Sequence, residues 1–514
     1  MLIAAVDIGT SSTRALLFDD AQFTGHAASV EYALRHPEPG AAELDPMEVV
    51  NAVVECIHGL TLKTSRKIEC VALSSAMHSL LAVDGRGVPL TPVYTWADNR
   101  ASQIQSSGQE WLPPTVSGPS LYLATGVPIH PMSPLLKLVW LRETCPALFA
   151  AADKFVSIKE FVCHQLFGQW IVDASIASAS GLYDLARRDW HAPALHTAGV
   201  QAHQLSQLAP PETLLRGLSS GYVAAMNIGA QTPFVLGASD GCLANLGAGL
   251  VASGATQGRR AVLTIGTSGA LRMAVPAPAT DRAMRTFCYA LNHDEFVIGG
   301  ATNGGGLPLR WLRDNFPQLR IGLAADDAYA SLAGLAALAP AGANGLLFHP
   351  YLAGERAPLW NADARASFIG LNFNHGPAHL VRAVMEGVLF NLAMILDVLE
   401  ELAHGPVDEI LAGGGFARSP FWLQMAADLF GRPLRVADMP ESTAQGAALL
   451  ALKALGQVAS LDAAVALLPG GGRTISPDPA MHVRYAALRP IFNDIPATLA
   501  PFHSRLASFQ RENR

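Results

Sequence analysis

The alternation of apolar runs and short polar turns along the chain repeats once. The tetrapeptide Ile-Gly-Thr-Ser occurs at residues 8–11 and again at 265–268, 257 residues later. Each copy lies between two apolar, β-rich runs, which are Leu2–Val6 and Ala15–Phe18 in the first copy and Ala261–Leu263 and Ala270–Val275 in the second. Two such runs joined by glycine and hydroxyl residues predict a β-hairpin at each place.

The spacing of the two copies bears on the domain organisation. Two unrelated Gly-Thr-Ser turns would also match at four residues, so the tetrapeptide alone leaves both interpretations open. The matched strands favour two related α/β domains, residues 1–250 and 251–514. We expect the second domain to end in a helical extension from about residue 456 that packs on it.

Periodic apolar positions predict two helices in the second half of the chain. After Pro377 apolar residues recur every three or four positions, at 380, 384, 388, 392, 395 and 399, until Gly405-Pro406 ends the pattern. Further on, the apolar segment 410–412 is followed by three glycines and by a segment with an apolar face at 421, 422, 425 and 429. This order predicts a strand, a glycine-rich loop and a helix, as in nucleotide-binding turns.

Composition narrows the class of protein. Half of the 514 residues are apolar, 15% are charged, and the formal net charge is −7. This length exceeds what one hydrophobic core supports. The negative net charge argues against a nucleic-acid surface, which needs clustered cations. The uncharged stretches 217–239 and 241–258 are interrupted by glycine and polar residues, so we expect no membrane span.

The N-terminus and the cysteines predict a cytoplasmic protein. Asp7 interrupts the first apolar run and no basic residue precedes it, which is typical of a first strand rather than a signal peptide. The six cysteines are widely spaced and form no Cys-x-x-Cys pair, as expected of reduced thiols. We expect no nucleic-acid or membrane partner, and a homodimer is the one assembly that we consider.

The first predicted hairpin carries residues that suit a phosphate chain. In the octapeptide 7–14, Asp-Ile-Gly-Thr-Ser-Ser-Thr-Arg, glycine lets backbone N–H groups approach phosphate oxygens and the hydroxyls add further donors. Asp7 could hold Mg²⁺ directly or through water, and the alternative is a polar turn residue without a ligand. The second hairpin, Thr264–Gly269, could grip the same phosphates from the other domain.

A single carboxylate stands among small residues at 237–241, Gly-Ala-Ser-Asp-Gly. Small neighbours let a substrate approach, and phosphoryl transfer to an alcohol needs a group that positions and deprotonates the hydroxyl. Asp240 could be that base. From these residues alone, an Asx turn or the N-cap of a helix over 243–246 explains Asp240 better.

Further polar residues could line an acceptor site, and each has a structural alternative. They are Met77-His78, Trp96-Ala97-Asp98-Asn99-Arg100 and Lys159-Glu160. A histidine at a strand end is usually structural, and adjacent opposite charges usually form an ion pair. The residues alone leave these alternatives open.

Two segments resemble the signatures of the FGGY carbohydrate kinase family. Residues 132–143, Met-Ser-Pro-Leu-Leu-Lys-Leu-Val-Trp-Leu-Arg-Glu, are similar to the first signature, although Thr144 departs from the polar or amide residue that usually follows. Residues 366–371 and 379–386 are similar to the second. The resemblance covers nearly the whole chain. It implies an α/β fold of two ribonuclease H-like domains, as in actin and the Hsp70 ATPase, with a nucleotide cleft between the domains.

The resemblance also implies roles for the candidate residues. Asp240 would be the general base, and Asp7 and Asp240 would lie at the Mg²⁺ that accompanies ATP. The implied nucleotide-binding residues are Gly9, Thr10, Ser11, Ser12, Thr13, Arg14, Gly266, Thr267, Gly306, Arg310, Gly414, Gly415 and Ser419. The implied substrate-binding residues are Met77, His78, Trp96, Asp98, Arg100, Lys159 and Asp240.

Within the family, the chain resembles gluconate kinases most, through residues 76–81, 96–100, 157–160, 173–182 and 237–247. Xylulose kinases usually carry an amide after the catalytic aspartate, where this chain has Gly241. The resemblance therefore implies transfer of the γ-phosphate of ATP to D-gluconate, giving 6-phosphogluconate. The carboxylate of gluconate needs a cationic partner, and we expect Lys159 or Arg100 to bind it.

Two other functions stay open. The first is the same chemistry on another acceptor, such as xylulose, ribulose or glycerol. The second is an ATP-dependent clamp that transfers no phosphate to a sugar, because an actin-like fold does not fix function. A clamp would leave His78 and Asp98 without a role.

Overall fold

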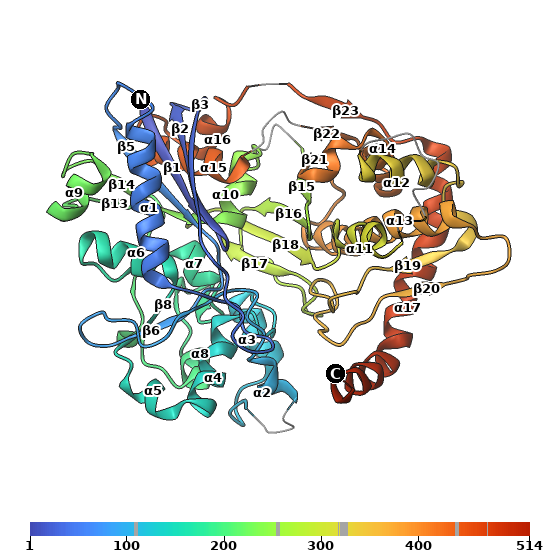
Figure 1. The fold of residues 1–514 in the computed structure, drawn as a ribbon, viewed down its shortest axis with the longest axis horizontal. Coiled ribbons are helices and arrows are strands. Elements are labelled where there is room, and N and C mark those ends of the chain that lie inside the picture. The colour runs from blue at the N-terminus through green and yellow to red at the C-terminus, as the bar shows by residue number, and fades with distance from the viewer. Residues whose placement is uncertain are drawn as a thin grey trace. The chain divides into compact units, whose positions relative to one another are not determined.

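The chain forms two compact units, and each is assembled from separate segments (Figure 1). The computed structural model describes residues 1–106, 111–252, 258–316, 318, 327–436, 441–469 and 471–513. The first unit comprises Met1–Gly254, Ala274–Val297 and Glu441–Pro469, and the second comprises Ala255–Met273, Ile298–Pro440 and Gly470–Arg514. The division into continuous domains at residue 250 stays a prediction, because compact units need not follow chain order.

The first unit is built on a sheet with the strand order β13-β14-β5-β1-β2-β3. Its strands are β1 Leu2–Ile8, β2 Ser12–Asp19, β3 Gln22–Glu31, β5 Cys70–Ser75, β13 Leu214–Leu215 and β14 Phe234–Ser239. Since β1, β5 and β14 are parallel, their carboxyl ends lie at one edge of the sheet. Open α/β sheets bind ligands beyond such an edge.

Both faces of this sheet are buried, which explains why β1 is apolar nearly throughout instead of alternating. The even-numbered residues of β1 pack in one core with helix α1 (Pro46–Thr61). The odd-numbered Ile3 and Ala5 pack in another core with α10 (Asp240–Gly247) and α15 (Ser442–Ala454). Helix α15 thus comes from the far end of the chain to complete the first unit.

A group of shorter elements follows β5 in the first unit and is drawn mainly in turquoise in Figure 1. Those used below are α4 Pro134–Thr144, β8 Lys154–Val156, α6 Ile158–Phe167, β9 Ile171–Asp173 and α7 Ala174–Ser178. Strand β17 (Phe287–Ala290) also belongs to the first unit, through its separate segment Ala274–Val297. Side chains that accept hydrogen bonds from free backbone N–H groups fix where the helices begin. Ser157 caps α6 in a capping box with Glu160, and Asp173 caps α7.

The second unit contains strands in the order β18-β16-β15-β21-β22-β23. They are β15 Arg260–Ile265, β16 Gly269–Val275, β18 Phe296–Thr302, β21 Glu409–Gly413, β22 Leu434–Val436 and β23 Arg473–Ile475. The helices are α11 Leu307–Asn315, α12 Ala328–Ala337, α13 Pro377–Leu402, α14 Pro420–Phe430 and α17 Pro479–Glu512. Of the predicted C-terminal extension, α17 packs on α13 and α14, whereas α16 (Leu461–Val465) packs on α15 in the first unit.

The two predicted hairpins are confirmed. Asp7 pairs with Arg14 between β1 and β2, and Thr264 pairs with Ala270 between β15 and β16. In each sheet the first strand of the hairpin also pairs in parallel with a strand that comes later in the chain. This partner is β5 in one sheet and β21 in the other. The repeated tetrapeptide therefore marks the same supersecondary unit in both sheets.

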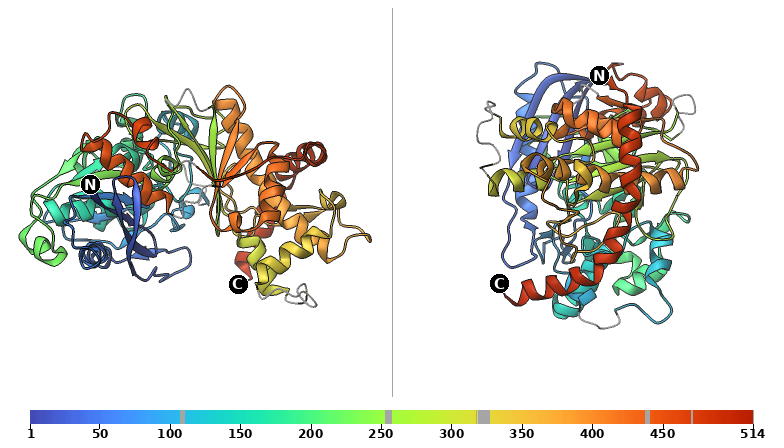
Figure 2. Two further views of the ribbon diagram at one scale, coloured as in Figure 1. Left: turned by 90° about the horizontal axis from the view of Figure 1, so that it is seen from above. Right: turned by 90° about the vertical axis from the view of Figure 1, so that its right-hand side faces the viewer.

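The predicted helices of the second half are confirmed as well. The apolar period after Pro377 corresponds to α13, and the glycine-rich order corresponds to β21, a loop and α14. Helix α17 is the long red helix in the right-hand view of Figure 2. Among the described residues, no helix combines the length and the hydropathy that a membrane span requires.

Candidate active site

The turn between β1 and β2 is tight, and two aromatic side chains hold it by hydrogen bonds. Gly9 N–H donates to Ser12 O at 3.0 Å, and a Cβ on Gly9 would lie only 2.9 Å from that oxygen. Tyr32 donates its hydroxyl to Gly9 O at 2.6 Å, and Trp96 Nε1 donates to Thr10 Oγ1 at 2.9 Å. The turn is thus fixed before any phosphate arrives.

The predicted phosphate-binding residues of this turn differ in exposure. Ser11 is exposed, and so is Arg14, whose guanidinium lies 3.6 Å from Glu441 Oε1. Thr13 is buried, with its Oγ1 3.4 Å from Tyr32 Oη. Thr13 therefore points its side chain into the first unit.

Asp7 and Asp240 lie close enough at the carboxyl edge of the first sheet to interact electrostatically. Asp7 is half-buried at the end of β1 and accepts a hydrogen bond from Ser74 Oγ at 2.8 Å. Loss of solvent, and next the charge of Asp240, raise the pKa of Asp7 to about 7. Two carboxylates that disfavour each other's ionisation form a site suited to a cation.

Asp240 is the first residue of α10, and its neighbours explain its position. Ser239 caps the helix by accepting from Cys242 N–H at 3.4 Å, so the alternative that Asp240 is the N-cap is wrong. Upstream, β14 is irregular between Val235 and Ala238. Gly237 has φ +71° there, and a Cβ would lie 1.6 Å from Leu73 O, so only glycine permits this approach of β14 to β5.

His78 is buried and is hydrogen-bonded to other parts of the first unit. Its Nδ1 lies 2.7 Å from Ala179 O and its Nε2 lies 3.2 Å from Tyr289 Oη. Because a carbonyl only accepts, Nδ1 carries the proton and Nε2 accepts from the tyrosine. The backbone oxygen of His78, which has φ +65°, accepts from Lys137 Nζ at 2.8 Å.

The two expected partners of a substrate carboxylate are already paired within the protein. Arg100 donates to Asp98 and Glu43 at 2.6 Å each and to Glu38 at 2.8 Å. Lys159 Nζ lies 2.7 Å from Asp173 Oδ2, and both side chains are at most 2% exposed. This geometry does not support the hypothesis that Arg100 or Lys159 binds gluconate, because each cation already neutralises a carboxylate.

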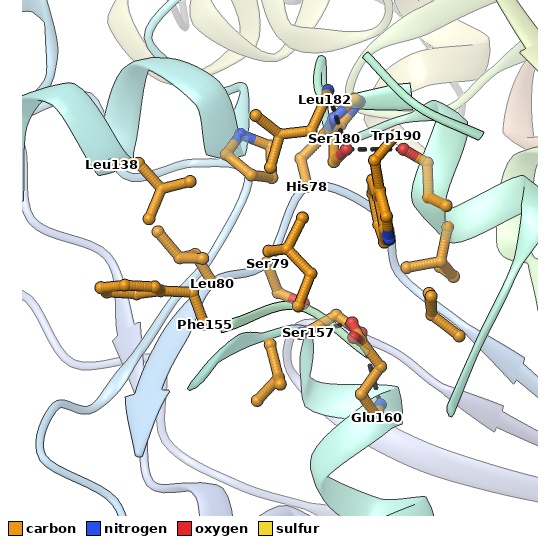
Figure 3. A pocket seen from close by; sticks show the side chains of 16 residues that line it. His78, Ser79, Leu80, Leu138, Phe155, Ser157, Glu160, Ser180, Leu182 and Trp190 are labelled. Carbon is orange, nitrogen blue, oxygen red and sulfur yellow. Dashed lines mark hydrogen bonds between the residues drawn. The ribbon is translucent and has the colours of Figure 1, made fainter. Parts of the chain in front are cut away.

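The remaining acceptor candidates are more accessible. Met77 is half-buried, and Trp96 is 37% exposed. His78 lines a small cavity of about 30 Å³, together with side chains that include Ser79, Leu138 and Trp190 (Figure 3). That volume suits a water molecule and is too small for a sugar.

The second unit contains a pocket of about 660 Å³. Residues that are far apart in sequence line it, and those predicted to bind the nucleotide are Gly266, Thr267, Gly306, Arg310, Gly415 and Ser419. Gly414 is not among the described residues that line it; this residue has φ +87°, and a Cβ would lie 2.6 Å from Ile265 O. Gly414 therefore shapes the turn after β21.

One wall of this pocket was not predicted from the sequence. Helix α12 contributes Tyr329, Ala330, Ala333, Gly334 and Ala337, which share one helical face. A second group of lining residues lies just before α14 and in its first turn: Phe416, Arg418, Phe421 and Trp422. Alanine and glycine carry no chemical signal in a sequence, although their spacing of three and four is a helical period that could have marked the wall.

Comparison with known proteins agrees with this arrangement. Residues 2–247 match the N-terminal domain and residues 261–455 the C-terminal domain of the FGGY family of carbohydrate kinases. The chain is 41% identical over 510 residues to a gluconokinase from Bacillus subtilis (strain 168), covering 98% of each chain. It is 28% identical over 511 residues to a xylulose kinase from Escherichia coli (strain K12), covering 96% of this chain and 99% of the relative.

Solved structures show the same architecture. The chain superimposes on a xylulose kinase and on a gluconate kinase, both from Lactobacillus acidophilus, with a TM-score of 0.90 for each. The identities are 33% and 32%, and each match covers 98% of this chain and 99% of the solved chain. The predicted α/β fold with two domains of the FGGY kinase type is confirmed. The chain belongs to the FGGY family of carbohydrate kinases.

Proposed function

We propose that the protein transfers the γ-phosphate of ATP to D-gluconate, giving 6-phosphogluconate. The observation that carries the choice of acceptor is the 40–41% identity to two gluconokinases over 98% of the chain. Xylulose kinases from organisms that include Lactococcus lactis and Escherichia coli share 24–28%, and the solved xylulose kinase from Lactobacillus acidophilus shares 33%. The solved structures do not separate the acceptors, since a xylulose kinase and a gluconate kinase match equally well.

Asp240 is the proposed general base. It lies at the N-terminus of α10, next to small residues that leave room for an acceptor hydroxyl. In this role it orients the hydroxyl and takes its proton as the oxygen attacks the γ-phosphorus. Because Asp240 belongs to the first unit, ATP held by the second unit must present its γ-phosphate to an acceptor held by the first.

Asp7 and Asp240 fit a magnesium ion. The raised pKa of Asp7 reflects burial and the nearby charge of Asp240, and a divalent cation would offset both. Mg²⁺ prefers carboxylate oxygen and keeps several waters, so two protein ligands suffice beside phosphate oxygens. When bound, the ion would neutralise charge on the transferred phosphoryl group.

The two hairpins and the pocket of the second unit are the proposed ATP site. The pocket volume of about 660 Å³ falls within the usual range for small-molecule sites. Residues 9–14 would contact phosphate from the first unit, with Thr13 doing so through its backbone, since its side chain is buried. Gly266 and Thr267 would do so from the second.

On the acceptor side, Met77 and Trp96 are proposed to contact the sugar acid, and His78 to shape the site. Asp98 and Arg100 would act through the ion pair that holds their loop, and Lys159 through the ion pair that holds helix α6. A homodimer and a cytoplasmic location stay predictions, which size-exclusion chromatography and cell fractionation would test.

A panel of acceptors tests the proposal. The protein is assayed by coupled ADP release with gluconate, xylulose, ribulose and glycerol, and the product position is read by NMR. We expect kcat/KM to be at least about tenfold higher for gluconate than for any other acceptor. A preference for xylulose would favour the ketose kinase alternative, and ATP hydrolysis indifferent to all acceptors would favour a clamp.

A further inference from the structure

Helix α7 contacts both sides of the proposed acceptor site. It packs against β14, which leads to Asp240, and against β17, which carries Tyr289. Directly after the helix, Ala179 O accepts the Nδ1 proton of His78 at 2.7 Å. Near its start, Ser175 meets Ser239, the residue before Asp240. All of these residues belong to the first unit.

The contact between Ser175 and Ser239 is short and buried. The two hydroxyl oxygens lie 2.6 Å apart, and Ser239 N–H also donates to Ser175 Oγ at 3.1 Å. Both side chains are fully buried. Ser239 is also the N-cap of α10, so its hydroxyl joins α7 to the first turn of the helix that begins with Asp240.

A buried ion pair also holds the N-terminal end of α7, where Ser175 lies. Asp173 Oδ1 accepts from Ser175 N–H and Ile176 N–H at 2.9 and 3.0 Å, which fixes the first turn of the helix. Its Oδ2 faces Lys159 Nζ at 2.7 Å. A buried carboxylate needs such a partner, and the pair ties α7 to helix α6, which carries Lys159.

The small cavity is lined by both α7 and His78. Its lining includes Ile176 and Ala177 of α7 as well as His78 and Ser79, and the last two are labelled in Figure 3. Less van der Waals contact is available across a cavity. The position of the His78 ring therefore depends on the bonds to Ala179 and Tyr289.

We propose that α7 is a positioning element of the acceptor site, with Ser175 as the positioning residue for Asp240 and the Lys159–Asp173 pair as its anchor. Helix α7 is linked to Asp240 through Ser239, and to His78 through Ala179, which directly follows the helix. A shift of α7 would therefore displace the base and the acceptor pocket together. The inference rests on the proposed function, in which Asp240 takes the proton of the acceptor. It also assigns Lys159 a role inside the protein.

The variant Ser175→Ala tests the link to Asp240. It removes the acceptor for Ser239 N–H and the contact between the hydroxyls. We expect kcat to fall about tenfold, because small misplacements of a catalytic group are costly, while KM for ATP stays within about twofold of wild type. The matched control is Thr197→Val in helix α8 (Ala192–Ala198), where a buried hydroxyl donates to Pro193 O at 2.8 Å. If kcat of Ser175→Ala equals that of the control, the proposal is overturned.

A second variant covers the case in which Ser175→Ala does not fold. The double variant Lys159→Met/Asp173→Asn removes both charges and keeps an oxygen that can cap α7. We expect kcat to fall about fivefold or more, as for the loss of one buried contact to a catalytic group. Unchanged kcat in this variant would show that the ion pair does not anchor the site.

A measurement that needs no turnover separates this inference from the proposed function. In ¹⁵N-histidine-labelled wild type, His78 should show a protonated Nδ1 and an accepting Nε2, with its signal identified by its loss in His78→Gln. The double variant should show a mixture of tautomers. An unchanged His78 signal would overturn the role of α7, whether or not wild type phosphorylates any acceptor of the panel.

Discussion

Asp7 and Asp240 together make the carboxyl edge of the first sheet strongly acidic. The exposed Arg14 lowers the pKa of Asp7, but its effect is smaller than the opposing effects of burial and of Asp240. A base that sits beside a metal-type carboxylate suits phosphoryl transfer, where charge must be balanced on both the attacking and the transferred groups. Replacing either carboxylate should therefore affect chemistry more than folding.

We expect Asp240→Asn to lower kcat by at least about 10²-fold, since general base catalysis contributes on that order. The side chain keeps its size, so the unfolding temperature should stay close to that of wild type. The measurement is kcat by coupled ADP release, and the control is Asp189→Asn at an exposed residue of the first unit. Near-wild-type turnover in a folded Asp240→Asn protein would remove Asp240 from the base role.

Lys137 gives a prediction about pH. Its ammonium is buried, and burial lowers its pKa from an ordinary 10.5 to about 7, although it donates to His78 O and Met132 O. Above pH 7 the unfolded chain therefore binds more protons at this residue than the folded chain does. The cost of burying the charge is largest below pH 7 and diminishes as the pH rises toward 10.5.

The free energy of unfolding of wild type should consequently rise relative to that of Lys137→Met between pH 7 and 9, by roughly 1–2 kcal/mol. Denaturant unfolding at both pH values measures the difference. Lys63→Met, at an exposed lysine, should show no such trend. A constant difference between wild type and Lys137→Met would mean that the lysine keeps its proton throughout.

The sequence predicted the residue types of the site better than their partners. The resemblance to a known family singled out Asp7 and Asp240, because a carboxylate among glycines and hydroxyls also fits a polar turn or a helix cap. Arg100 and Lys159 also stand out, yet their carboxylate partners Glu38, Glu43 and Asp173 are distant in sequence or separated by a turn. Pairing of that kind depends on tertiary structure, which local sequence does not encode.

At the level of elements, both sheets use a hairpin followed by a parallel strand. The hairpins and α13 could be predicted because their sequence patterns are local. A hairpin shows a turn between two apolar runs, and α13 shows apolar residues every three or four positions. Helix α7 has only five residues, which is too short for a clear apolar period, and in α12 the helical period is carried by alanine and glycine, which are easily overlooked. Such elements gain their roles from what packs against them.

Helix α12 provides a test of the nucleotide pocket. Ala333→Phe places a large ring on the wall that Ala330 and Ala337 share, so we expect KM for ATP to rise about tenfold while KM for the acceptor stays unchanged. The control Leu338→Phe changes an exposed residue just after the helix. An equal effect of both variants on KM for ATP would indicate that α12 does not face the nucleotide.

At the scale of the whole molecule, the described lining of the large pocket belongs entirely to the second unit. Nucleotide binding should therefore not require an acceptor. We expect titration calorimetry without gluconate to give the same ATP affinity, within about twofold, for wild type and for the acceptor-side variant Met77→Ala. Ala333→Phe should weaken it, and a complete dependence of ATP binding on gluconate would contradict the assignment.

The interleaved segments of the two units have a consequence for how this gene can be cut and recombined. Helix α15 completes a core that starts with the first strand, and residues 274–297 add β17 to the same unit. A fragment that stops near residue 250 would thus expose the apolar underside of its own sheet and would aggregate. Chimaeras between family members should fold only when those two distant inserts are exchanged along with the N-terminal segment.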